Sequence, residues 1–159
     1  MANVFFLLGS NQGDKISRLT EARLQISRHV GPIVTTSSVY KTDAWGNKNQ
    51  ENFLNQVIEV ETELEPYAVL RLIQDIENKA GRKRMEKWGA RTLDIDILLW
   101  ENKVVANDDL QIPHPGIADR RFTLVPLAEI APLLIHPILQ KTINKLLEDC
   151  SDNLTVEKL

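Results

Sequence analysis

The chain has 159 residues and a formal net charge of −3 at pH 7, with 43% hydrophobic and 26% charged residues. This length and balance are typical of one ordinary globular domain, so we expect a single domain over residues 1–159. The negative charge argues against a general nucleic-acid-binding protein, and the single cysteine excludes an intramolecular disulfide framework. Because no apolar run reaches the roughly 18 residues of a membrane span, and the first residues lack a basic leader, we expect a cytoplasmic protein without a membrane partner.

The first part of the chain predicts an alternation of strands and helices. Residues 4–8 form a continuous apolar run of strand length, and residues 14–30 carry apolar side chains at helical spacing up to a Gly-Pro pair. Residues 33–42 are rich in Val, Thr, Ser and Tyr, which favours a strand. The polar, turn-rich residues 43–52 then predict a loop.

The middle of the chain repeats this pattern. Residues 53–64 alternate between the two faces of a long strand, and Pro66 opens a helix that Gly81 ends. Residues 93–100 alternate again and predict a strand between a basic loop and a proline-rich region. The apolar side chains of this strand are expected on one face: Leu93, Ile95, Ile97 and Leu99.

The last part of the chain predicts irregular structure with short helices near residues 124–129 and 139–149. The order β-α-β-β-α-β indicates an α+β, ferredoxin-like fold with a mostly antiparallel sheet. We expect the helices on one face of this sheet, which leaves the other face free to carry a site. Because the fold hosts many functions, the function has to be argued from particular residues.

Asp94 and Asp96 are the first candidate site residues. Side chains alternate along a strand, so these two aspartates are expected to share the face opposite Ile95. Neighbouring carboxylates repel unless a cation lies between them, and hard oxygen ligands favour Mg²⁺ together with substrate phosphates. An exposed acidic pair on an amphipathic strand has the same pattern, so the pair by itself leaves both interpretations open.

The segment before these aspartates is strongly basic. It contains one acid, Glu86, and its cations are Lys79, Arg82, Lys83, Arg84, Lys87 and Arg91. A solvated charged loop is the ordinary interpretation of such a run. Beside a candidate metal pair, however, guanidinium groups are what a polyphosphate needs, so the two features together favour phosphate chemistry.

Aromatic residues indicate a second subsite, for a flat heterocycle. Phe53 and Asn55 share a strand face, where a ring can stack and an amide can form hydrogen bonds. Phe122 is another candidate ring, although core packing is the more frequent role of either phenylalanine. Trp45 and Trp88 lie in the two polar loops, a position that suits a lid over an aromatic ligand.

Further polar residues extend the candidate site towards a nucleotide. His114 lies between two prolines and close to Arg120, where it could donate to a phosphate or carry a proton. Gln74 and Glu77 share one side of the second helix and could reach a nucleotide, with a solvated helix face as the equal alternative. The sequence has no P-loop and no glycine-rich kinase loop, so ATP would be bound by side chains and metal ions.

Residues 87–98 resemble the characteristic motif of 6-hydroxymethyl-7,8-dihydropterin pyrophosphokinases, a family of folate biosynthesis. The resemblance extends along nearly the whole chain through short motifs at residues 8–11, 38–42, 53–55, 81–84, 112–115 and 120–122. It implies a ferredoxin-like fold and the transfer of the terminal pyrophosphoryl group of ATP to the hydroxymethyl group of a reduced pterin, with AMP as the other product. It also implies two Mg²⁺ ions, and we expect an in-line attack of the pterin hydroxyl on the β-phosphorus.

The resemblance implies roles for the candidate residues. The expected catalytic residues are Arg82, Arg84, Arg91, Asp94 and Asp96, and the two aspartates are also the expected metal ligands. The expected ATP-binding residues are Gln74, Glu77, Arg84, Lys87, Trp88, Arg91, Ile97, His114 and Arg120. The expected pterin-binding residues are Thr42, Asp43, Trp45, Phe53, Asn55, Trp88 and Phe122.

Three other functions remain as alternatives. Ferredoxin-like sheets with exposed aromatic residues bind RNA, although the acidic charge and the aspartate pair oppose that function here. A ligand-sensing domain without chemistry and a metal-dependent nuclease fit parts of the same pattern. For the pyrophosphokinase, ATP and the reduced pterin are the only partners that we expect, without nucleic acid and without an obligate protein partner.

Overall fold

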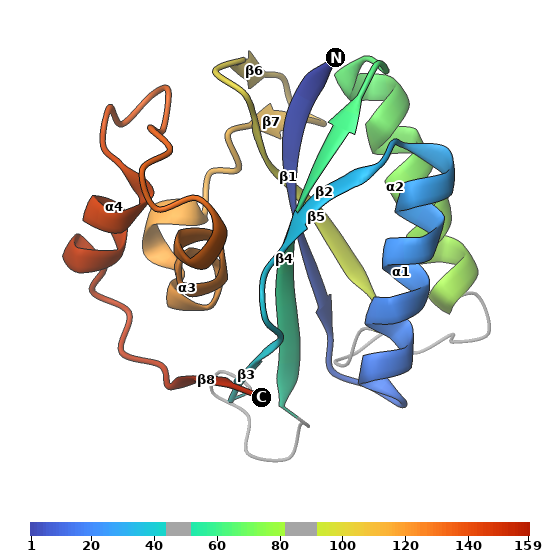
Figure 1. Ribbon diagram of the computed structural model, residues 1–159, viewed down its shortest axis with the longest axis horizontal. Coiled ribbons are helices and arrows are strands. Elements are labelled where there is room, and N and C mark those ends of the chain that lie inside the picture. The colour runs from blue at the N-terminus through green and yellow to red at the C-terminus, as the bar shows by residue number, and fades with distance from the viewer. Residues whose placement is uncertain (44–51, 82–91) are drawn as a thin grey trace.

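The computed structural model describes residues 1–43, 52–81 and 92–159. An antiparallel sheet lies between two pairs of helices (Figure 1). The expected α+β, ferredoxin-like order is confirmed by β1 (Ala2–Ser10), α1 (Lys15–His29), β2 (Ile33–Thr36), β3 (Tyr40–Thr42), β4 (Phe53–Thr62), α2 (Pro66–Gly81) and β5 (Asp94–Trp100). The chain continues through β6 (Val105–Ala106), β7 (Gln111–Ile112), a short 3₁₀ helix η1 (Ile117–Asp119), α3 (Arg121–Ile130), α4 (Ile143–Asp149) and β8 (Val156–Lys158).

The sheet has the strand order β5-β1-β4-β3-β8, and β2 also pairs with β4. Strand β1 is central and apolar because both of its faces are covered: Phe6 and Leu8 belong to one core, Phe5 and Leu7 to another. Strand β5 pairs with β1 alone and is therefore an edge strand of this sheet.

Helices α1 and α2 cover the first face of the sheet (Figure 1). The Asp14 side chain caps α1 by accepting a hydrogen bond from the Ser17 N–H at 3.2 Å, and the buried stripe of the helix includes Leu19 and Ile26. In α2, Val69 and Ile73 are buried at helical spacing. The helical period of the apolar residues is enough to predict both helices from the sequence, because each helix packs one side on the sheet.

The second face carries helices as well, which corrects the expectation that all helices lie on one face. Helices α3 and α4 pack there on Phe5, Leu7 and Val57, and they bury Leu124 and Leu146 in the second core. The physical reason is that the strands are apolar on both sides, so the second face also needs cover. These helices run from Arg121 to Ile130 and from Ile143 to Asp149, close to the ranges expected for them.

Strand β5 corrects the expected position of Leu99. Phe5 pairs with Leu99 and Phe6 pairs with Ile97, so Leu98 is an additional residue in β5 opposite this step of β1. Such a β-bulge shifts the alternation by one residue. Ile95 and Ile97 therefore face the first core as expected, whereas Leu99 faces the second core.

The expected strand over residues 33–42 is divided into β2 and β3. Between them, the Ser37 hydroxyl accepts a hydrogen bond from the Val57 N–H at 2.9 Å, and the Ser37 carbonyl accepts one from the Gln56 side chain at 2.7 Å. The Ser37 N–H still donates to the Val57 carbonyl at 2.8 Å, so side-chain groups supplement the backbone ladder at this point. Within the described ranges, no helix has the length and apolarity that a bilayer crossing requires.

Candidate active site

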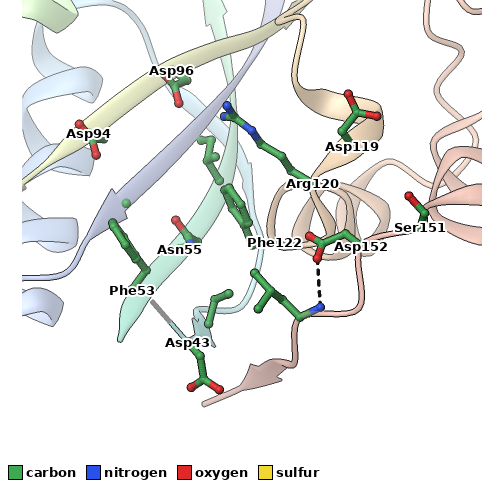
Figure 2. Close-up of a pocket in the computed structure, with 14 residues that line it drawn as sticks. Asp43, Phe53, Asn55, Asp94, Asp96, Asp119, Arg120, Phe122, Ser151 and Asp152 are labelled. Carbon is green, nitrogen blue, oxygen red and sulfur yellow. Dashed lines mark hydrogen bonds between the residues drawn. The ribbon is translucent and has the colours of Figure 1, made fainter. Parts of the chain in front are cut away.

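A cavity of about 640 Å³ opens on the second face of the sheet. Its walls come from β1, β4, β5, the start of α3 and the segment that follows α4 (Figure 2). The lining residues are Leu7, Gly9, Thr42, Asp43, Phe53, Asn55, Asp94, Asp96, Asp119, Arg120, Phe122, Ser151, Asp152 and Leu154. Residues expected for a phosphate subsite and for a ring subsite therefore share one hollow.

Asp94 and Asp96 project from β5 into this cavity (Figure 2). They pair with Gly9 and Leu7 on β1, two residues apart in both strands, so they lie on one face as the alternation predicts. Both aspartates are half-buried. No group of three or more potential ligands of the His, Cys, Asp or Glu type gathers among the described residues, so a metal ion here needs further ligands from substrate and water.

Asn55 lies beside the aspartates on the cavity floor. The sheet register places Gly9 between Asp94 on β5 and Asn55 on β4. A Cβ atom added to Gly9 would lie 2.7 Å from the Asn55 Oδ1 atom, so the absence of a side chain at Gly9 makes room for the amide. Asn55 is 4% exposed, so its amide is held in the cavity floor with little access to water.

Two aromatic rings and one hydroxyl line another part of the cavity. Phe53 comes from β4 and Phe122 from α3, so the two rings reach the cavity from the sheet and from the helix layer (Figure 2). Thr42 is 2% exposed, and its buried Oγ1 atom has no hydrogen-bond partner among the described residues. A buried hydroxyl without a partner is costly, so a ligand that bonds to it would gain affinity.

Arg120 is the one cationic residue among the described residues of the cavity wall. Its guanidinium Cζ atom lies 5.8 Å from the centroid of the Phe122 ring, within the range of a cation–π contact. The same side chain lies against Gly116, where an added Cβ would be 2.8 Å from the Arg120 Nε atom. In Figure 2 the guanidinium group reaches towards Asp96, so it is directed to the place where phosphate charge would be bound.

His114 does not line the cavity but lies close enough to be affected by its charges. Burial lowers the pKa of His114 from 6.5, the negative charge of Asp96 opposes this shift, and the positive charge of Arg120 adds to it. The Nδ1 atom accepts a hydrogen bond from the Gly116 N–H at 2.9 Å. At neutral pH the ring is therefore uncharged and carries its proton on Nε2.

Three further residues expected to bind ATP lie away from the cavity. Ile97 is buried in the first core, and Gln74 and Glu77 belong to α2 on the first face of the sheet. The Glu77 Oε2 atom accepts a hydrogen bond from the Ile95 N–H at 2.7 Å, which joins α2 to β5. These residues therefore lie on the opposite face of the sheet from Asp94 and Asp96.

The remaining expected residues fall outside the described part of the chain. These residues are Trp45, Arg82, Arg84, Lys87, Trp88 and Arg91.

Several wall residues were missed at the level of sequence. Leu7 has the pattern of an ordinary core residue, and Gly9 the pattern of a turn. Ser151, Asp152 and Leu154 come from the end of the chain and meet α3 only through tertiary contact. The expected pairing of β1 with β4 could have indicated that Gly9 lies beside Asn55. No local pattern marks the other residues as part of the cavity wall.

Comparison with known proteins gives the same assignment along nearly the full chain. Residues 5–132 match the family model described as 7,8-dihydro-6-hydroxymethylpterin-pyrophosphokinase (HPPK). A 2-amino-4-hydroxy-6-hydroxymethyldihydropteridine pyrophosphokinase of Aquifex aeolicus is 43% identical over 145 residues, which cover 91% of this chain and 90% of the relative. The protein of the same name from Haemophilus influenzae is 40% identical over 158 residues, 99% of this chain and 98% of the relative.

Solved structures show a matching fold. The crystal structure of wild-type Plasmodium falciparum HPPK-DHPS with SDX-DHP matches with a TM-score of 0.71 at 17% identity. The match covers 94% of this chain and 43% of the Plasmodium chain, so this chain spans less than half of that protein. The chain therefore belongs to the 7,8-dihydro-6-hydroxymethylpterin-pyrophosphokinase family, and the expected pyrophosphoryl transfer from ATP to hydroxymethyldihydropterin in folate synthesis is confirmed.

Proposed function

We propose that the cavity holds the dihydropterin ring and the phosphates of ATP side by side, and that residues 1–159 act as a single pyrophosphokinase domain. The observation that carries the proposal is the shared cavity of Asp94 and Asp96 with Phe53, Asn55 and Phe122. A phosphate subsite next to a ring subsite is what this reaction needs, because its two substrates have to meet at one phosphorus atom.

The dihydropterin is bound at the Phe53 end of the cavity. A flat heterocycle stacks on Phe53 and Phe122, which supply apolar area from two walls. The Asn55 amide and the Thr42 hydroxyl then form hydrogen bonds with the polar edge of the ring. Asp43 lines the same end and adds an acceptor for ring N–H groups.

Asp94 and Asp96 suit Mg²⁺ rather than a closed protein site. Magnesium in phosphoryl-transfer enzymes usually takes one or two carboxylates and completes its shell with phosphate oxygens and water. The half-buried pair and the absence of a third clustered ligand in the described residues fit that ligand set. Two bound Mg²⁺ ions would neutralise charge on the phosphates and lower the pKa of the attacking hydroxyl.

The chain itself contributes alignment and charge. The pterin hydroxyl oxygen forms a bond to the β-phosphorus, the bond from that phosphorus to the α,β-bridging oxygen breaks, and AMP leaves in line. Arg120 holds the phosphates against the cavity wall, and the His114 Nε2–H donates to a phosphate oxygen. Arg82, Arg84, Lys87 and Arg91, which lie outside the described residues, are assigned the remaining positive charge on sequence grounds, and Trp45 and Trp88 are assigned to the pterin on the same grounds.

The nucleoside part of ATP lies around the edge of the sheet. Because β5 is the edge strand, a triphosphate at Asp96 can extend past this strand towards α2. Glu77 and Gln74 on α2, with Ile97 of β5, then contact the nucleoside. This position accounts for the separation of these residues from the cavity.

The central test compares two aspartate variants in an assay of AMP formation from ATP, Mg²⁺ and the reduced pterin. Asp96→Ala is expected to reduce turnover at least about 1,000-fold, because a lost metal ligand removes charge stabilisation in the transition state. Asp108→Ala is the control, since Asp108 is an exposed carboxylate remote from the cavity wall. A folded Asp96→Ala protein with the wild-type rate would exclude the metal assignment.

A further inference from the structure

The end of the chain forms one wall of the proposed pterin subsite. Ser151, Asp152 and Leu154 line the cavity, and Figure 2 shows Ser151 and Asp152 on the side away from β5. The family model matches residues 5–132, so these three residues lie beyond the matched part of the chain. The C-terminal segment, defined here as residues 151–158, is therefore a wall that the family motifs do not describe.

Asp152 joins this segment to α3 through both of its carboxylate oxygens. The Oδ2 atom accepts a hydrogen bond from the Arg121 N–H at 2.9 Å, and the Oδ1 atom accepts one from the Leu154 N–H at 3.0 Å. Arg121 is the first residue of α3, and the preceding residue, Arg120, provides no side-chain cap. Asp152 thus caps the helix from 31 residues away and supplies an acceptor where the helix lacks one.

The capped residue lies between two residues of the cavity wall. Arg120 precedes Arg121 and Phe122 follows it, so a bond to the Arg121 N–H fixes the backbone from which both side chains project. The second bond of Asp152 fixes Leu154, which lines the same cavity. One carboxylate therefore sets the distance between the Phe122 wall and the Leu154 wall.

The other end of the C-terminal segment is fixed to the sheet. Strand β8 pairs with β3, and Val156 and Lys158 lie opposite Thr42 and Tyr40. Thr42 lines the cavity as well. The segment thus runs from α3 to the sheet edge, held at α3 by the Asp152 carboxylate and at the sheet by the pairing of β8 with β3.

We propose that Asp152 is a positioning residue for the dihydropterin: it holds Phe122 and Leu154 at the separation that the ring needs. The proposal rests on the assignment of this end of the cavity to the pterin. Loss of the carboxylate frees the start of α3 and the C-terminal segment together. The pterin KM then rises most, because both freed walls contact the ring, while the ATP phosphates keep Asp94 and Asp96 and lose only the fixed position of Arg120.

The test measures the KM for each substrate at saturation of the other in three variants. Asp152→Ala is expected to raise the pterin KM about 5- to 20-fold, the range of about one lost hydrogen bond, with a smaller rise for ATP through Arg120. Asp152→Asn keeps one acceptor oxygen and is expected to give an intermediate pterin KM. Leu154→Ala removes the apolar wall without touching the cap and is expected to raise the pterin KM alone.

Asp149→Ala is the matched control. Asp149 lies three residues before Asp152 and forms ion pairs with Lys141 and Lys145 on the surface. All assays are performed well below the melting temperature of each variant, so general unfolding does not enter the KM values. An unchanged pterin KM in Asp152→Ala, equal rises for both substrates, or the same effect in Asp149→Ala would overturn the positioning role. A wild-type protein that forms no AMP would instead overturn the proposed function.

Discussion

At the scale of the residue, Gly9 shows how closely the cavity floor is packed. Its missing Cβ is what allows the Asn55 amide to lie at its observed position, 2.7 Å from the site of that absent atom. The Asn55 side chain is buried, so it has little room to move aside. Gly9 therefore shapes the proposed pterin subsite although it has no side chain to place there.

Gly9→Ala is expected to raise the pterin KM about tenfold, because the added methyl group displaces the Asn55 amide and a steric change of this size costs about 1–3 kcal/mol. The measurement is the pterin KM at saturating ATP and Mg²⁺. Gly81→Ala is the control, since an added Cβ there meets no described residue within 4 Å. Equal KM values for the two alanine variants would contradict the proposed packing.

A substitution at Thr42 can distinguish an effect on protein stability from an effect on ligand binding. Within the described part of the chain, the buried Oγ1 atoms of Thr42 and Thr92 both have no hydrogen-bond partner. Thr42 lines the cavity, and Thr92 does not. The two threonines thus differ in whether a ligand can satisfy the hydroxyl.

Thr42→Val and Thr92→Val are both expected to stabilise the unliganded protein by about 1 kcal/mol, because each removes a buried hydroxyl that lacks a partner. Only Thr42→Val is expected to weaken pterin binding. Thermal melts report the first effect as a rise of about 2–4 °C, and calorimetry with the pterin reports the second. Unchanged affinity in Thr42→Val would show that the hydroxyl does not contact the ring.

At the scale of the element, Glu129 fixes α3 to the sheet at the end opposite Asp152. One oxygen of Glu129 accepts hydrogen bonds from the Tyr40 hydroxyl at 2.7 Å and the Ser38 N–H at 2.9 Å, and the other accepts one from the Ser38 hydroxyl at 2.9 Å. Burial acts to raise the pKa of Glu129, but these bonds outweigh it and hold the pKa below 4.5. Burial, together with the bond to Glu129, raises the pKa of Tyr40 to about 12.

Tyr40→Phe is expected to destabilise the protein by about 1 kcal/mol at pH 7, a modest value because Glu129 remains in contact with water. A carboxyl whose pKa is lowered by folding contributes stability above its unfolded value of 4.5. That stability is lost as the pH falls through the folded pKa. The difference between wild type and Tyr40→Phe is therefore expected to shrink below pH 4.5.

Urea unfolding at several pH values measures this difference. Tyr67→Phe is the control, because the Tyr67 hydroxyl donates to Asp109 on an exposed part of the surface. If Tyr40→Phe kept its full effect at pH 3, the stabilising partner of the hydroxyl would not be the Glu129 carboxylate.

At the scale of the whole molecule, two histidines connect stability to pH. Burial lowers the pKa of His136 and of His114 from 6.5, so both rings are neutral in the folded protein. The His136 Nδ1 atom accepts hydrogen bonds from the N–H groups of Ile138 and Leu139 at 3.2 and 3.1 Å. Protonation of Nδ1 would break these contacts.

The free energy of unfolding is therefore expected to decrease as the pH falls from 7 to 5. Unfolded histidine binds a proton near pH 6.5, whereas the folded rings resist it, so acid favours the unfolded chain. His136→Gln is expected to reduce the slope by up to about 1.4 kcal/mol per pH unit. His29→Gln at the exposed end of α1 is the control, and a wild-type slope in His136→Gln would contradict the argument.

Local patterns in the sequence were sufficient for the element order and for the shared face of Asp94 and Asp96. Alternation in strands and the helical period depend on neighbours in the chain, so they can be followed without tertiary contacts. The same alternation put Phe53 and Asn55 on one face, and both line the cavity. The motif resemblance added Thr42 and gave Arg120 and Phe122 definite roles, which no periodicity would have supplied.

Tertiary structure decided the features that depend on pairing between distant segments. Leu99 changed face because β5 has an additional residue opposite β1, and α3 covered the second face because the strands are apolar on both sides. Asp152 became part of the cavity wall through a bond to Arg121, 31 residues away. Such contacts leave no period in the sequence, because their partners are brought together only when the cores and the sheet form.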